Sequence, residues 1–190
     1  PATRSARVIP LGLKGIGGPG ITSATRSEAN ERLIELICTL AKKLCKKLRF
    51  TSILVNKDNK YGIHTDEANI GSESAIIGLG DFRGGELVIF DPSDEEWRRL
   101  DVRNQLHRFH PRHPHYTRES DGERVTIVLY VHKAVYHLSD ELRDELTDLG
   151  FPLPDRDELE KMKLATTAFE SQFPDPTELC EVARQALMGA

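Results

Sequence analysis

The chain has 190 residues, of which 38% are hydrophobic and 29% are charged, a composition typical of one globular domain. The net charge of −4 excludes a protein whose whole surface is a basic nucleic-acid clamp, and three cysteines argue against a disulfide scaffold or a zinc finger. No apolar stretch reaches the ~18 residues of a membrane span and no signal peptide opens the chain, so we expect an intracellular protein, cytoplasmic or nuclear. Because the first residue is Pro1, we expect a processed product or an excised domain.

The N-terminal half of the chain begins with a loop and a helix. Residues 1–26 are rich in Gly, Pro, Ser and Thr, which predicts a flexible or lid-like segment. Residues 27–48 follow the spacing of an amphipathic helix, with Ser27 as a possible N-cap. The helix ends in a basic cluster that is either a solvated face or a track for the phosphates of DNA or RNA. This cluster comprises Lys42, Lys43, Lys46, Lys47 and Arg49.

The middle of the chain reads as short strands separated by turns, which predicts a sandwich, jelly roll or barrel. The strands are expected at 50–55, 61–65, 74–79, 86–90, 100–102, 106–109 and 125–131, with a turn at 81–85. Helices are expected at 140–149, 155–168 and 176–187, packed outside the sheet. We therefore expect an α+β domain over 27–138, with 139–190 as a helical extension on the same domain.

The clearest chemical signal is His64-Thr65-Asp66. Residues two apart in a strand point to the same face, so an imidazole and a carboxylate would project together. Two histidines and one carboxylate on one face leave three coordination positions open, as in the facial triad of non-haem Fe(II) oxygenases. The simpler interpretation is a hydrogen-bonded pair at the end of a strand.

The third ligand is sought among the downstream histidines. Asp121-Gly122 is a hairpin signal, and a two-residue turn there places a set of side chains on one face. That set is His115, Thr117, Arg124, Thr126 and Val128. We therefore expect His115 as the ligand, with His110 or His113 as alternatives. His110 has the opposite parity, and Pro114 disfavours extending the strand to His113.

The spacing of this strand pair also suggests what binds beside the metal. His115 and Arg124 would lie roughly 13 Å apart along extended chain, a gap that a five-carbon diacid can bridge. Such a diacid would chelate the metal at one end and form a bidentate salt bridge with Arg124 at the other, where Thr126 can add a hydroxyl donor. Alternatively, Arg124 pairs with Glu119 across the hairpin.

These residues together resemble a known family. Residues 56–130 resemble the Fe(II)- and 2-oxoglutarate-dependent dioxygenases, through Asn56, His64-x-Asp66, Pro114-His115 and Arg124-x-Thr126. The resemblance implies a double-stranded β-helix with helices on either side in sequence. It also implies His64, Asp66 and His115 as iron ligands, Arg124 as the anchor of 2-oxoglutarate, and O2 as the second cosubstrate. Asn56 is placed beside the cosubstrate, or it simply ends its strand.

A narrower resemblance concerns the substrate. His64-x-Asp66-x-x-Asn69 has the form found in the TET/JBP group, which oxidises the methyl of 5-methylcytosine or thymine in DNA, and there the Asn helps to hold the base. Asn69 is accordingly a candidate substrate contact. Arg83, at the tip of a turn, is either a second contact or a solvated residue. The alternatives are hydroxylation of a protein side chain or small metabolite, and a non-catalytic cupin-like metal-binding module.

Overall fold

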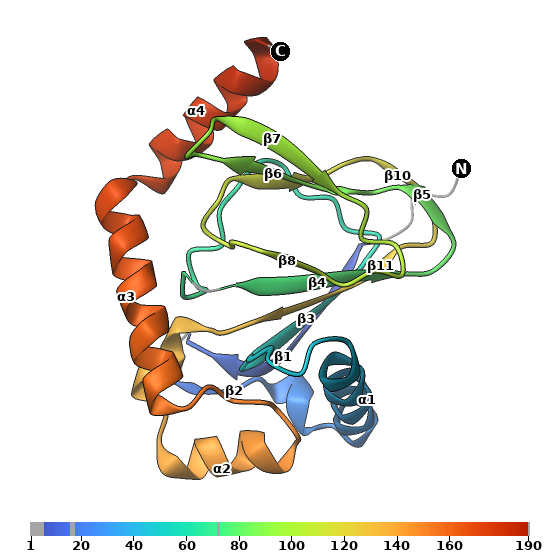
Figure 1. Cartoon of the computed structure of the whole chain (residues 1–190). Coiled ribbons are helices and arrows are strands. Elements are labelled where there is room, and N and C mark those ends of the chain that lie inside the picture. Colours follow the sequence, from blue (N-terminus) through green and yellow to red (C-terminus); the bar gives the residue numbers. More distant parts are fainter. Residues whose placement is uncertain (1–5, 16–17, 72, 190) are drawn as a thin grey trace.

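The computed structural model describes residues 6–15, 18–71 and 73–189. Its strands form two antiparallel sheets that face each other, with helices on the outer sides (Figure 1). The larger sheet has the order β2-β1-β3-β11-β4-β8, and the smaller sheet has the order β7-β6-β9. A two-stranded ribbon of β10 and β5 adjoins them. The expected α+β class is thus confirmed.

The strands and helices lie along the chain as follows. The strands are β1 (Arg7–Lys14), β2 (Gly20–Ile21), β3 (Ser52–Lys57), β4 (Ser74–Leu79), β5 (Phe82–Gly84), β6 (Leu87–Asp91), β7 (Glu96–Leu100), β8 (His107–Phe109), β9 (His115–Thr117), β10 (Ser120–Gly122) and β11 (Val125–Tyr130). The helices are α1 (Glu28–Leu44), α2 (Asp140–Asp148), α3 (Arg156–Gln172) and α4 (Pro176–Gly189), with short 3₁₀ turns at Ser23–Arg26 and Lys133–His137.

The side chains of the larger sheet alternate between two environments. On β3, Ile53 packs into the core beneath α1, whereas Leu54 lines a cavity on the opposite face. The same alternation separates Ile77 from Ile76 on β4, and the two-residue period of a strand is its cause. The core helix α1 and the cavity therefore lie on opposite faces of the larger sheet.

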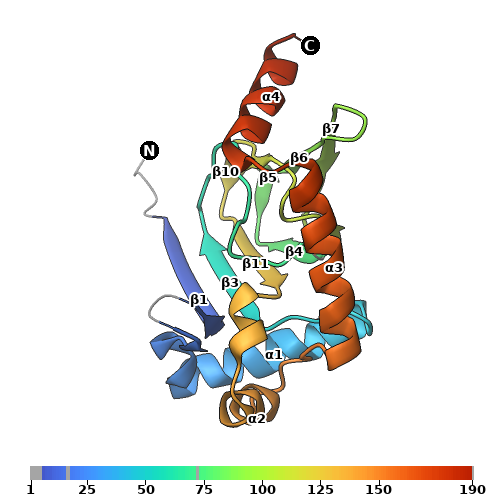
Figure 2. The same cartoon turned by 90° about the vertical axis from the view of Figure 1, so that its left-hand side faces the viewer.

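The C-terminal helices wrap one side of the domain. In Figure 2, α3 runs alongside the edge of the sheets and leads into α4, whose C-terminal end extends away from the body. Leu179 and Val182 of α4 border a pocket with Phe90 of the smaller sheet, so α4 lies against the outer face of that sheet. None of the helices in the described ranges combines the length and apolarity that a membrane crossing would need.

The N-terminal segment differs from the expected loop. Residues 7–14 form β1, which pairs with all of β3 and extends the larger sheet. Pro10 and Gly12 read as breakers in the sequence, but burial of Leu11 and Leu13 outweighs that local preference. The remainder of the expected loop includes residues 1–5 and 16–17, which lie outside the described residues.

Several of the expected strands and turns differ from those in the structure. The segment at 61–65 forms only a single bridge, between His64 and His115, and the segment at 100–102 is replaced by β7. The expected turn at 81–85 contains β5, which pairs with β10. The prediction of a hairpin turn at Asp121-Gly122 is also wrong, because both residues belong to β10. The β5–β10 pair and the His64–His115 bridge join segments distant in sequence, which local patterns do not reveal, whereas β7 pairs with its neighbour β6 across a short turn.

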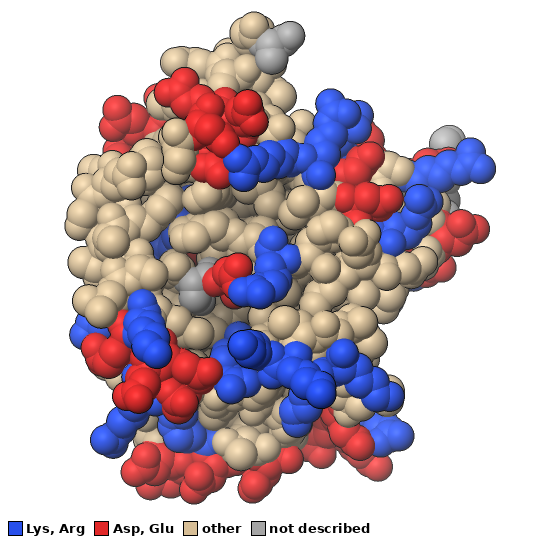
Figure 3. Space-filling model, viewed as in Figure 1, with Lys and Arg blue, Asp and Glu red and all other residues tan. Residues whose placement is uncertain are grey.

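The basic cluster of the sequence lies on the α1 side of the molecule. Lys and Arg side chains gather over α1 in the lower part of Figure 3, and acidic ones gather below them over α2. Lys42 and Lys43 belong to the last turn of α1 and are exposed, as are Lys46 and Lys47 just beyond it. Arg49 is ion-paired with Glu158 at 3.0 Å. The cluster is thus separated by the larger sheet from the cavity.

Candidate metal and cosubstrate site

A loop between β3 and β4 carries the first two candidate ligands. His64 is held against β9 by reciprocal backbone hydrogen bonds with His115, at 3.0 and 2.9 Å. The backbone N–H of Asp66 donates to the carbonyl of Pro111 at 2.9 Å. Backbone contacts alone therefore bring the His-x-Asp segment beside His115, although the expected strand is absent.

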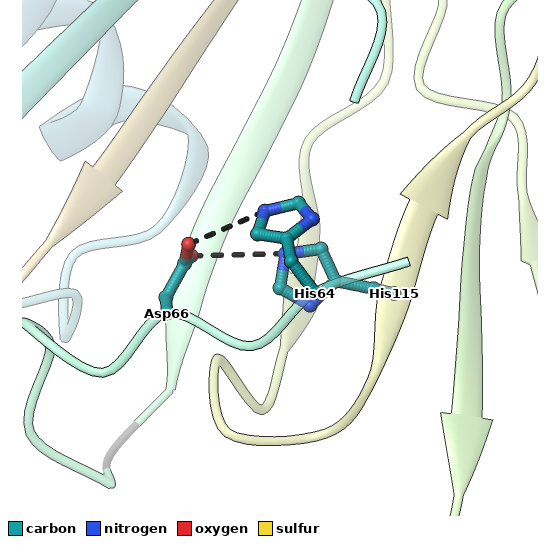
Figure 4. Close-up of side chains that lie close together, drawn as sticks. All are labelled: His64, Asp66 and His115. Atoms are coloured by element: carbon teal, nitrogen blue, oxygen red, sulfur yellow. Dashed lines mark ion pairs between the residues drawn. The ribbon is translucent and has the colours of Figure 1, made fainter. Parts of the chain in front are cut away.

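The three side chains converge (Figure 4). His64 Nε2 lies 3.5 Å from Asp66 Oδ1, and His115 Nε2 lies 3.8 Å from Asp66 Oδ2. One ligand atom from each residue lies within 4.8 Å of the other two, and among the described residues no other three His, Cys, Asp or Glu side chains come together in this way. Two imidazole nitrogens and a carboxylate oxygen match the donor set of a 2-His-1-carboxylate iron centre.

The other two candidate histidines lie elsewhere. The rings of His110 and His113 pack together at a tilt, with centroids 4.5 Å apart, and both contact Phe169 of α3, which His113 stacks on. These two histidines connect α3 to the β core, and they do not belong to the His64–Asp66–His115 cluster. His107 binds the carbonyl of Asp101 through Nε2 at 2.8 Å.

Backbone carbonyls orient both imidazoles in the cluster. The Nδ1 of His64 lies 2.8 Å from the carbonyl of Gly62, and the Nδ1 of His115 lies 2.8 Å from the carbonyl of His113. A proton on each Nδ1 satisfies these contacts and leaves each Nε2 lone pair facing Asp66. This fixes the tautomer that a metal ligand requires.

The two histidines differ in their electrostatic environments. Burial lowers the pKa of His115 below its ordinary value, although the charge of Asp66 opposes the effect. For His64, burial also acts to lower the pKa, but the hydrogen bonds and the charge of Asp66 outweigh it, so the pKa is raised. His115, the more buried of the two, is thus neutral at pH 7 and available as a ligand.

The cluster opens into a cavity of about 210 Å³ between the two sheets. The cavity is mostly apolar, with polar side chains placed at its two ends. Its lining comprises Leu54, Asn56, Tyr61, His64, Asp66, Ile76, Leu87, Phe109, His115, Thr117, Arg124, Thr126 and Val128. All six candidate metal- and cosubstrate-binding residues therefore line one cavity.

Arg124 is the unusual member of this lining. Its side chain is buried, with the residue only 2% exposed, yet Nε and Nη2 lack a hydrogen-bond partner within the described part of the chain. Burial lowers the pKa of Arg124 and the charge of Asp58 opposes this, but a guanidinium keeps its charge at neutral pH. The alternative partner Glu119 pairs with Lys60 instead. A buried cation with free donors calls for an anionic ligand.

The backbone around Arg124 is shaped to admit its side chain. A Cβ on Gly85 would lie 2.8 Å from Arg124 Nε, and the φ of +71° at Gly85 also favours glycine. The guanidinium sits 5.8 Å from the centre of the Phe82 ring. Asn56 pairs in register with Thr126, and its Oδ1 accepts a hydrogen bond from Tyr61 at 3.1 Å. These contacts place the polar end of the cavity around Arg124.

The two candidate substrate contacts lie outside the cavity lining. Asn69 is buried and its Nδ2 donates to Asp66 Oδ2 at 3.3 Å. Arg83 is exposed on β5, opposite Asp121 of β10. Asn69 is thus next to a candidate ligand, and Arg83 is at the surface.

Most of the apolar lining residues, and Tyr61, were not predicted from the sequence; they are Leu54, Ile76, Leu87, Phe109 and Tyr61. The alternation along β3, β4 and β11 is a signal for Leu54, Ile76 and Val128, because they point away from the α1 core. Thr117 lies on β9 and was expected on the same face as His115. Tyr61 has no such signal, because it reaches the cavity from a loop.

The same fold is found in solved oxygenase structures. A 2OG-Fe(II) oxygenase family oxidoreductase from Burkholderia pseudomallei aligns with a TM-score of 0.51 and 20% identity, covering 66% of this chain and 65% of its own. NgTET1 in complex with 5mC DNA aligns with a TM-score of 0.50 and 15% identity, covering 69% of this chain and 62% of its own. No family model and no curated protein matches the sequence. The chain spans less than two thirds of either solved structure, and over that span it shares the fold of the 2OG-Fe(II) oxygenases.

Proposed function

We propose that this protein is an Fe(II)- and 2-oxoglutarate-dependent dioxygenase that hydroxylates a C–H bond, and that its facing sheets are the halves of a double-stranded β-helix. The observation that carries the proposal is the buried, unpartnered guanidinium of Arg124, which lies in the same cavity as His64, Asp66 and His115. A metal-binding module without a cosubstrate has no use for such a group. This favours an oxygenase over a cupin-like binding protein.

In this proposal each polar group has a defined task. His64, Asp66 and His115 hold Fe(II) through Nε2, a carboxylate oxygen and Nε2, and Arg124 receives the distal carboxylate of 2-oxoglutarate as a bidentate pair. Thr126 and Asn56 flank that carboxylate. Bound iron and 2-oxoglutarate supply the oxidation, in which O2 converts 2-oxoglutarate to succinate and CO2 and a substrate C–H becomes C–OH. The apolar lining excludes water from the reacting groups.

The size of the cavity bears on where the substrate binds. A volume of about 210 Å³ is below the ~300–1,000 Å³ usual for ligand pockets, so it suits the cosubstrate alone. His64 and Asp66 are partly exposed, with side-chain exposures of 36% and 29%. The substrate is therefore expected to approach from the side of these two residues rather than enter the cavity.

The first substrate to test is the methyl group of 5-methylcytosine or thymine in nucleic acid. It is supported by the His64-x-Asp66-x-x-Asn69 pattern and by the shared fold with NgTET1, a structure in complex with 5mC DNA. The alternative is a protein side chain or a small metabolite. Two observations favour that alternative: the basic cluster lies across the larger sheet from the cavity, and Asn69 directs its amide to Asp66.

The test of the oxygenase class is an anaerobic titration of the apoprotein with Fe(II) and then 2-oxoglutarate, followed by visible absorption. We expect a weak charge-transfer band that needs both additions, disappears in His115→Ala, and in Arg124→Ala requires far more 2-oxoglutarate. Arg99→Ala is the matched control, because Arg99 is exposed on the outer strand β7. Iron binding without a band would refute the cosubstrate assignment, and no iron binding would refute the metal site.

The substrate is then tested by succinate release in the presence of 5-methylcytosine DNA, unmodified DNA, or a mixture of peptides and metabolites. A nucleobase oxygenase would show stimulated release, and a mass increase of the oligonucleotide, only with methylated DNA. Its DNA binding would also weaken steeply with salt, since phosphate contacts release counterions. Stimulation by the mixture alone would support the alternative.

A further inference from the structure

A chain of side-chain contacts leads from the carboxylate of Asp66 to the C-terminal helix α3. Asn69 Nδ2 donates to Asp66 Oδ2 at 3.3 Å, and the carbonyl of Asn69 accepts from Arg112 Nε at 3.1 Å. Arg112 Nη2 in turn bonds Glu170 of α3 at 2.9 Å. We refer to Asn69, Arg112, Glu170 and Thr166 as the α3 clamp.

Thr166 holds the same loop from a second point on α3. Its Oγ1 accepts a hydrogen bond from the backbone N–H of Gly71 at 2.6 Å. The approach is close, because a Cβ on Gly71 would lie 2.9 Å from the Cα of Thr166. Gly71 comes two residues after Asn69, so the loop is held on both sides of Ile70, directly by Thr166 and through Arg112 by Glu170.

The contacts of the α3 clamp are protected from water near the metal site. Asn69 is 5% exposed and the side chain of Arg112 is 10% exposed, while Glu170 is half-exposed. A charge-assisted hydrogen bond from a buried guanidinium to a carbonyl is stronger than its solvent-exposed counterpart. The inner part of the clamp should therefore matter more than the outer ion pair.

The clamp also determines how the carboxylate is presented. Asp66 Oδ1 faces His64 and Oδ2 faces His115, and the bond from Asn69 fixes the carboxylate torsion in this arrangement. The backbone of the loop is pinned independently, by hydrogen bonds from Ile70 to Val131 and from Lys133 to Ala68. Loss of the Asn69 amide should thus free the side chain of Asp66 without unfolding the loop.

We propose that Asn69 is a positioning residue for the carboxylate ligand, and that α3 stabilises this arrangement through Arg112 and Thr166. The inference rests on the proposed metal site. It gives Asn69 a role different from the base contact that the narrower family resemblance implies. It also makes the C-terminal extension a structural part of the metal centre, since Thr166 bonds the loop that carries Asp66 and Glu170 is linked to that loop through Arg112.

The experiment is an anaerobic titration of the apoprotein with Co(II), read by visible absorption, with Fe(II) affinity measured in parallel. Asn69→Ala should weaken binding by about 10- to 100-fold, the usual effect of losing a hydrogen bond to a ligand. Its Co(II) spectrum should also change, because a free carboxylate can bind through both oxygens. Arg112→Lys, which cannot reach Asn69 and Glu170 together, and Thr166→Val should each weaken binding several-fold.

Matched controls separate positioning from a general structural role. Thr167→Val and Glu160→Gln change neighbouring residues of α3 without touching the loop contacts, so Kd and the Co(II) spectrum should remain those of the parent. Thermal unfolding of every variant is measured with a chelator present. A variant that loses stability but keeps the parent Kd and spectrum supports a structural role only and overturns the inference.

The outcomes also distinguish the inference from the proposed function. If the parent protein binds neither Co(II) nor Fe(II), the metal site itself is wrong. If the parent binds and Asn69→Ala binds within twofold with an unchanged spectrum, only the positioning role is wrong. If Asn69→Ala keeps the metal affinity but loses kcat/KM for a base substrate, Asn69 is a substrate contact instead.

Discussion

Replacing Arg124 with methionine should make the empty protein more stable while abolishing its response to 2-oxoglutarate. The side chain is buried and two of its nitrogens lack partners, which costs about 1–3 kcal/mol for each such buried group. Favourable interactions with the Phe82 ring and with the charge of Asp58 offset part of this cost. We therefore expect Arg124→Met, which keeps a long unbranched side chain, to stabilise the apoprotein by about 1–2 kcal/mol.

The ligand should reverse this order. For a domain of this size, 1–2 kcal/mol corresponds to a rise in Tm of roughly 2–8 °C. Saturating 2-oxoglutarate, at about 100 times its Kd, would add about 2.7 kcal/mol to the parent and nothing to the variant. Without 2-oxoglutarate, the parent should thus be less stable than the variant. With Mn(II) and 2-oxoglutarate both present, the parent should be the more stable of the two.

The assay is thermal unfolding of both proteins by circular dichroism, with Mn(II) present throughout and 2-oxoglutarate added or omitted. Mn(II) is chosen because it occupies an oxygen- and nitrogen-donor site without turnover. Arg99→Met serves as the exposed control and should shift neither curve. The reasoning would be refuted by an Arg124→Met protein that is less stable than the parent in both conditions, or by equal stabilisation of both proteins by 2-oxoglutarate.

Two further predictions concern the cavity wall and the aromatic contact with α3. Gly85→Ala should destabilise the fold by about 1–2 kcal/mol and raise the Kd of 2-oxoglutarate, because its Cβ would lie 2.8 Å from Arg124 Nε. Gly62→Ala, where nothing lies within 4 Å, should do neither, and equal effects in a binding titration would contradict this account. Burial lowers the pKa of His110 to about 4, so the unfolded chain takes up the proton first as pH falls from about 6.5 towards 4. Stability should drop by roughly 1–2 kcal/mol over that interval after allowance for partial exposure, and urea unfolding of His110→Phe, which keeps an aromatic ring against Phe169, should show a smaller drop.

The sequence predicted which polar residues line the cavity better than it predicted the topology around them. His64 and Asp66 are close in sequence, so their proximity needs only a local turn of the chain. The expected face of His115, Arg124 and Thr126 is correct, because all three line the cavity. The reason given for it is wrong, since Asp121 and Gly122 form part of β10 instead of a hairpin turn. These residues still share one face because β9 and the start of β11 both border the cavity.

The features that the sequence did not reveal depend on contacts between distant segments. The strand β1 contains Pro10 and Gly12, and its buried pairing with β3 outweighs both local signals. The tie between Arg112 and Glu170 joins residues 58 positions apart, and neither residue belongs to a recognisable motif. The C-terminal helices were expected from their periodicity, but their contacts with the Asp66 loop could be found only in three dimensions.

The alternation along the larger sheet has a consequence for how such a protein can change over time. Side chains such as Ile53 and Ile77 belong to the core that holds α1, whereas their neighbours Leu54 and Ile76 face the cavity side of the sheet. Because the two sets share strands but not contacts, substitutions at the cavity positions leave the principal core largely untouched. The shape and polarity of the cavity can therefore change on one side of the sheet while the other side preserves the fold.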